Sequence, residues 1–122
     1  MTALTAFTTQ LDNFLFYLSK QFPTNNSIKT YHNSINLIKK INPRQVILFF
    51  KQYIYIYKEK IDNEDASFFL EKEYNEELKN NNESMLEVIK FKDLWKNSND
   101  KQKKQVFRYF QLLCLLSENY AL

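Results

Sequence analysis

Residues 106–116 read Val-Phe-Arg-Tyr-Phe-Gln-Leu-Leu-Cys-Leu-Leu, and nine of these eleven side chains are apolar or aromatic. A helix that is apolar on nearly every side is one that other helices surround. We therefore predict a helix over residues 100–118 that forms the centre of an all-α bundle, with Phe110 and Leu113 in the core. Within this stretch Cys114 has no His or Arg pair close by in sequence, so we interpret it as a small buried apolar residue.

The residues just before this helix indicate where it begins. Asn99 is a favoured N-cap residue, and Gln102 follows three positions later, which is the spacing of a capping box. Lys101, Lys103 and Lys104 then follow, although a helix N-terminus favours acidic side chains. Because the cost is only a few tenths of a kcal/mol, these lysines need no function to persist, but phosphate groups are an obvious partner for them.

The first helices are predicted from apolar residues spaced three and four positions apart. The first stripe lies on a helix that ends before Pro23, and it consists of Leu4, Phe7, Leu11, Phe14, Leu18 and Phe22. A second helix begins at Ser27 as its N-cap, with a stripe of Ile28, Tyr31, Ile35 and Ile38 that Leu37 and Ile41 widen. The single histidine, His32, has no acidic residue near it in sequence, so we place it at the surface or the boundary.

Asn42 and Pro43 predict the start of a third helix, because Asn is a favoured N-cap and Pro fits the first helical position. We expect this helix to run from Pro43 to Lys60. Residues 53–57 read Tyr-Ile-Tyr-Ile-Tyr, which has high strand propensity, so a strand is the competing interpretation. Helical spacing returns from Met85 to Trp95. Phe16, Phe49, Tyr55 and Ile56 lie off the main stripes, and a contiguous exposed patch of them would mark an interface.

Together these patterns predict one compact single-domain bundle of five or six helices over residues 1–122, with an acidic loop region at about 62–84. The net charge of +3 conceals a segregation of charge along the chain. Residues 1–61 carry a net +6, residues 62–87 a net −7 and residues 88–122 a net +4. The acidic middle is either a solvated face or one pole that docks a basic partner or a second copy.

Composition excludes several classes of function. The chain has no glycine, which the Walker loop, the dinucleotide-binding fingerprint, the serine-hydrolase elbow and the EF-hand loop all need. One His and one Cys cannot form a His/Cys zinc site or an internal disulfide, although carboxylate-rich metal sites are not excluded. We therefore expect no catalytic residues, no cofactor and no metal, so the protein is predicted not to be an enzyme. No secretory signal or apolar span is recognisable, which predicts a soluble intracellular protein that uses neither a membrane nor a small molecule.

One resemblance extends over most of the chain. It comprises Phe68-Phe69-Leu70-Glu71, an acidic gap, an apolar helix reaching Leu94-Trp95, and a lysine-rich start before Arg108-Tyr109-Phe110-Gln111-Leu112-Leu113. This order resembles small uncharacterised all-helical proteins of nucleocytoplasmic large (giant) DNA viruses. The resemblance implies a viral all-helical protein in the host cytoplasm or the virion. It implies no activity and no functional residues.

Two hypotheses about function follow. The first is a non-enzymatic viral interaction or structural protein, a virion or viral-factory component, that contacts a viral or host protein or a second copy. Its predicted contact residues are Asp62, Glu64, Asp65, Phe68, Phe69, Glu73, Glu76 and Glu77. The alternative is a helical nucleic-acid-binding protein that uses Lys96, Lys101, Lys103, Lys104 and Arg108. The scarcity of arginine, 2 residues against 15 lysines, argues against this alternative.

Overall fold

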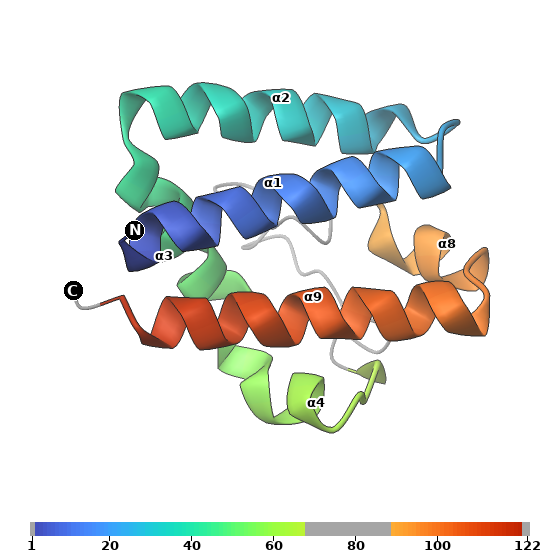
Figure 1. Ribbon diagram of the computed structural model, residues 1–122. Coiled ribbons are helices and arrows are strands. Elements are labelled where there is room, and N and C mark those ends of the chain that lie inside the picture. Colours follow the sequence, from blue (N-terminus) through green and yellow to red (C-terminus); the bar gives the residue numbers. More distant parts are fainter. Residues whose placement is uncertain (1, 68–88, 121–122) are drawn as a thin grey trace, which may run out of the picture.

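A computed structural model describes residues 2–67 and 89–120, and it confirms an all-α bundle. Three long helices lie next to one another: α1 (Ala3–Gln21), α2 (Asn26–Ile41) and α9 (Asp100–Glu118). Figure 1 shows that α1 lies between α2 and α9 and runs antiparallel to α9. The shorter elements are α3 (Pro43–Tyr53), the 3-10 helix η1 (Tyr55–Tyr57), α4 (Lys58–Asp62) and α8 (Phe91–Lys96). None of the residues in the two described ranges is in a β-strand.

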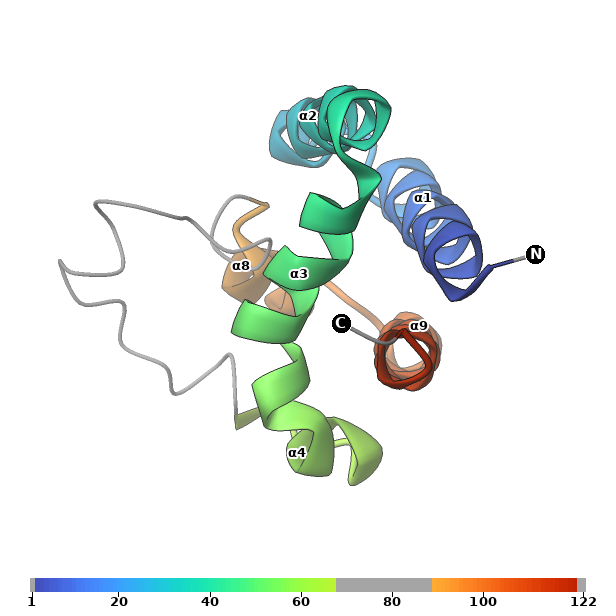
Figure 2. The same ribbon diagram turned by 90° about the vertical axis from the view of Figure 1, so that its left-hand side faces the viewer.

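The core lies where α1, α3, α8 and α9 meet. Figure 2 shows α3 crossing one side of the layer that α1, α2 and α9 form. Phe14 of α1 packs edge-on against Phe110 of α9, with ring centroids 5.3 Å apart, and Phe7 packs against Phe50 of α3 at 5.1 Å. Phe110 and Leu113 are fully buried, as predicted, and Cys114 is buried too. Each fully buried Phe or Leu contributes roughly 1.5–3 kcal/mol, so these contacts are the main source of stability.

Helix α9 is covered on two sides and open on a third. It packs against α1, α3 and α4, which confirms its place within the bundle. Leu115, however, is 54% exposed, and Arg108 is exposed on the same side. The prediction that other helices enclose α9 all round is therefore wrong for this side. The reason is that the described elements that pack on α9, namely α1, α3 and α4, all lie on its other sides.

The ends of the long helices follow the local sequence closely, with one shift. The capping box at Asn99 and Gln102 is present, with both reciprocal hydrogen bonds at 2.8 and 2.9 Å. The N-cap of α2 is Asn25 and not Ser27. Asn25 accepts a hydrogen bond from the Ile28 amide and also donates one to the carbonyl of Ile89, so it joins α2 to the segment before α8. A long-range partner thus favours Asn25 over the nearby serine.

The third predicted helix is broken into three pieces. Helix α3 ends at Tyr53, and the chain continues through η1 into α4, so neither a single helix to Lys60 nor a strand over residues 53–57 is present. Ile54 is fully buried at the break, which lets the chain keep its apolar side chain in the core while changing direction. Asn42 occupies the N-cap position of α3, but its side chain makes no capping hydrogen bond there.

The helix predicted from Met85 to Trp95 is also interrupted. Lys90 has a φ of 55°, in the left-handed region, and α8 begins only at Phe91. Met85 lies outside the described residues. A non-glycine residue in the left-handed region is uncommon, and this conformation ends any helix that reaches it from the N-terminal side.

Candidate functional site

The outer face of α9 is the candidate site, and we define it as Lys101, Lys104, Arg108 and Leu115. The spacing of three, four and seven residues places all four on one side of the helix. All four side chains are exposed. The rise of an α-helix spreads them over about 21 Å along the axis. The three bases thus occupy the N-terminal half of an open helix face, and the leucine occupies its C-terminal half.

Between its two ends this face carries no negative charge. Between Asp100 and Glu118, at the two ends of α9, the helix has no acidic residue. Lys101, Lys104 and Arg108 form no ion pair with any other residue in ranges 2–67 and 89–120. Within the described ranges, no ion pair therefore occupies these three side chains.

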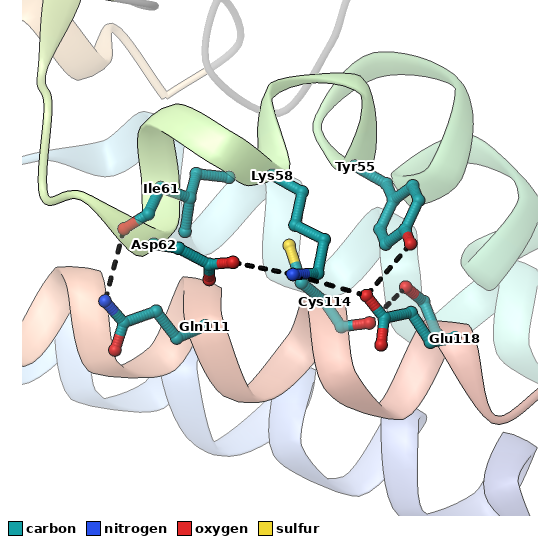
Figure 3. A network of polar contacts seen from close by, with 8 residues as sticks. Tyr55, Lys58, Ile61, Asp62, Gln111, Cys114 and Glu118 are labelled. Atoms are coloured by element: carbon teal, nitrogen blue, oxygen red, sulfur yellow. Dashed lines mark hydrogen bonds and ion pairs between the residues drawn. The ribbon is translucent and has the colours of Figure 1, made fainter.

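A polar network holds α4 against one flank of α9 (Figure 3). The Tyr55 hydroxyl donates to Glu118 at 2.9 Å, and the Lys58 ammonium contacts Asp62 at 2.6 Å and Glu118 at 3.5 Å. One turn further along α4, the Ile61 carbonyl accepts a hydrogen bond from the side-chain amide of Gln111 at 3.2 Å. These contacts keep α4 to the side of α9, so that the outer face stays uncovered.

The charges in this network stabilise the contact between α4 and α9 and do not activate a side chain for catalysis. The hydrogen bond to Asp62, with the negative charges of Asp62 and Glu118, raises the pKa of Lys58, so this lysine stays protonated. The hydrogen bond to Glu118 raises the pKa of Tyr55 in the same way. Burial raises the pKa of the neighbouring Cys114 thiol to about 12, which removes it as a nucleophile near neutral pH.

The other flank of α9 is joined to α1 by tyrosines and amides. Tyr109 stacks on Phe14, with ring centroids 4.9 Å apart, and its ring lies 5.8 Å from that of Tyr17. Burial, followed by the nearby Tyr109, raises the pKa of Tyr17. At the end of α1, Gln21 accepts a hydrogen bond from Gln102 at 3.0 Å. Contacts on both flanks thus fix the orientation of α9 between α1 and α4.

The five bases predicted for nucleic-acid contact do not all share this face. Lys101, Lys104 and Arg108 do, and Lys96 is exposed separately at the end of α8. Lys103 is turned toward the core side, where its ammonium lies 5.3 Å from the centre of the Trp95 ring. This cation–π contact holds the Lys103 ammonium against α8, so it does not join the other bases on the outer face of α9.

Only three of the eight residues predicted for protein contact lie within the described ranges. Asp62, Glu64 and Asp65 are exposed, and Asp62 is paired with Lys58. The Ser67 amide donates to Asp65 at 2.9 Å, and this hydrogen bond lowers the pKa of that carboxyl. The remaining predicted contact residues, Phe68, Phe69, Glu73, Glu76 and Glu77, lie outside the described residues.

Two features escaped the sequence interpretation. His32 has an acidic partner after all, since its Nε2 lies 2.6 Å from Asp12 of α1, twenty positions earlier in the chain. Leu37 and Ile41 were expected to widen the buried stripe of α2, but they are 61% and 85% exposed. Of the residues off the main stripes, Phe16 and Ile56 are also exposed, whereas Phe49 and Tyr55 are half-buried.

The described part of the chain holds no group of three or more His, Cys, Asp or Glu side chains that could bind a metal ion. None of the helices in the described ranges is both long enough and apolar enough to cross a bilayer. Comparison with protein-family models, curated proteins and solved structures finds no match for this chain. The resemblance to giant-virus proteins therefore stays a prediction.

Proposed function

We propose that this protein is a non-enzymatic binding protein that contacts an acidic surface of a partner protein through the outer face of α9. The observation that carries the proposal is the alignment of Lys101, Lys104 and Arg108 with the exposed Leu115 on one helix face, which has no acidic residue between its two ends. Bases steer an oppositely charged partner, while an exposed apolar side chain supplies contact area that binding removes from water. This proposal keeps the predicted mode of action and moves the contact surface from the acidic segment to α9.

Nucleic acid is the second candidate, because the same three bases would also contact phosphates. A helix that binds phosphates needs no exposed leucine in line with its bases, so Leu115 favours a protein partner. Lys103 packs on Trp95, so it is not in line with the other three bases, where a nucleic-acid backbone would contact them. The two candidates differ in what Leu115 contributes, and this difference can be measured.

The experiment compares two probes on the full-length chain: a synthetic glutamate-rich helical peptide with leucines at i, i+4 spacing, and a short DNA duplex. We expect the peptide to bind, and we expect both Lys104→Glu/Arg108→Glu and Leu115→Gln to weaken its binding. The matched control, Lys29→Glu/Lys60→Glu, makes the same change in net charge at two exposed lysines of α2 and α4. Circular dichroism of each variant checks that the helices are retained.

Three outcomes separate the readings. Equal loss of binding in the control pair would show that only net charge matters, and the α9 proposal would be wrong. Tight DNA binding that ignores Leu115→Gln and falls by orders of magnitude between about 50 and 200 mM salt would favour the nucleic-acid candidate. Absence of binding to the peptide, with the fold intact, would also contradict the proposal.

A further inference from the structure

A second surface lies where α2 turns into α3, and we define the α2–α3 corner as Leu37, Lys40, Ile41 and Arg44. All four side chains are exposed, and Ile41, at 85%, is the most exposed of the large apolar side chains in the described ranges. Leu37 and Ile41 are four residues apart on the same helix, so their side chains are neighbours. The turn is at the upper left of Figure 1, where the chain leaves α2 for α3.

The backbone explains why the two apolar side chains are uncovered. The Asn42 amide donates to the Ile38 carbonyl at 2.7 Å and so closes the last turn of α2, and Pro43 starts α3 at once. Ile41 is thus the final residue of α2, and no further turn of that helix follows it. The inward residues of this region, Ile35 and Val46, are buried, so the core is already closed without Leu37 and Ile41.

The charge around this apolar pair has one sign. From residue 13 to residue 58 the chain has no Asp or Glu, while seven Lys and Arg residues fall in the same range. Lysines in the last turn of α2 suit the negative end of the helix dipole and need no other explanation. Arg44 does not, because it lies in the first turn of α3, which has no acidic residue and where the dipole disfavours a base. The positive charge at the corner therefore exceeds what the helix ends favour.

We propose that the α2–α3 corner docks an acidic segment of a partner protein that carries an apolar pair of its own. Leu37 and Ile41 would form the dehydrated centre, and Lys40 and Arg44 would form a rim that selects negative charge. This proposal does not rest on the α9 face, because it concerns different helices and different residues.

Two other classes of partner fit the corner less well. An anionic membrane would need an apolar face along much of α2, yet none of its other outward residues is apolar: Asn26, Lys29, Thr30, Asn33 and Ser34. A nucleic-acid backbone would use the bases but would leave the apolar pair without a role. A protein segment uses both features at once.

The test is a nitrogen-15 NMR titration of the full chain with the glutamate-rich peptide described above and with a peptide of the same charge whose leucines are replaced by serine. The first peptide is expected to shift the amide signals of residues 37–44. Leu37→Gln/Ile41→Gln and Lys40→Glu/Arg44→Glu should each weaken binding at these signals by about fivefold or more. Ile56→Gln replaces an exposed apolar residue that lies in neither proposed surface, so it is the matched control and should leave these signals unchanged.

The proposal is overturned if the serine peptide binds the corner as tightly as the leucine peptide, since the apolar pair would then contribute nothing. It is also overturned if vesicles of phosphatidylserine, or a short DNA duplex, perturb residues 37–44 while neither peptide does. Shifts confined to residues 101–115 would contradict the corner and leave the α9 proposal standing. Shifts confined to residues 37–44 would support the corner and contradict the α9 proposal.

Discussion

Leu113 and Leu115 are two positions apart, and they lie in opposite environments. Leu113 is fully buried against the core, whereas Leu115 is 54% exposed on the outer face of α9. Two residues correspond to about 200° of helix rotation, so the two side chains point in nearly opposite directions. A stretch in which both positions are leucine gives no local sign of which one faces water. The packing of α1 and α4 on the flanks of α9 makes that difference.

Replacing each leucine by alanine should separate these environments. Leu113→Ala is expected to lower the free energy of unfolding by about 2–5 kcal/mol, because it leaves a cavity in a packed core. Leu115→Ala should change it by no more than about 0.5 kcal/mol, as is usual for an exposed site. Urea denaturation followed by circular dichroism measures both values. Equal effects in the two variants would contradict the arrangement of α9 described here.

At the level of single elements, two asparagines at N-cap positions show how much the tertiary surroundings matter. Asn99 accepts the Gln102 amide and completes a capping box at the start of α9. Asn42 precedes α3 by the same number of positions, but its backbone amide is used to close α2, and its side chain makes no capping bond. The short junction between α2 and α3 thus lets one residue end one helix while it begins the next.

The two caps should therefore differ in energy. Asn99→Ala is expected to cost about 1 kcal/mol, the usual loss for an N-cap that makes its hydrogen bond. Asn42→Ala should cost less than about 0.5 kcal/mol, because Pro43 supplies the first helical turn without help from the side chain. Thermal or urea unfolding of the two variants gives the comparison. A larger loss for Asn42→Ala would show that its side chain caps α3 in solution.

At the level of the whole molecule, contacts between distant parts of the chain tie the described helices into one unit. The His32–Asp12 pair joins α2 to α1, the Gln102–Gln21 bond joins α9 to α1, and Tyr55–Glu118 joins η1 to α9. Trp95 of α8 packs edge-on against Phe107 of α9, with ring centroids 5.4 Å apart. Disrupting any one helix exposes side chains from at least one other.

We expect this arrangement to unfold in a single cooperative transition. The chain has one tryptophan, Trp95, so its fluorescence reports on the packing of α8, while far-ultraviolet circular dichroism reports on all helices. The two signals should change at the same urea concentration, which is a standard test of two-state behaviour. A fluorescence change that precedes the loss of helix would show that α8 and its surroundings form a separate unit.

The local sequence was sufficient for the helical class, the end of α1 before Pro23, the capping box of α9 and the burial of Phe110 and Leu113. These features depend on residues within one or two turns, where apolar spacing and capping act directly. The spacing of Lys101, Lys104 and Arg108 on one helix face was likewise readable from their positions. Packing alone decided which faces stay open. It paired Lys103 with Trp95, gave His32 its Asp12 partner and left Leu37 and Ile41 in water. The physical reason is that an apolar side chain is buried only if another element covers it, and the covering residues come from distant parts of the chain.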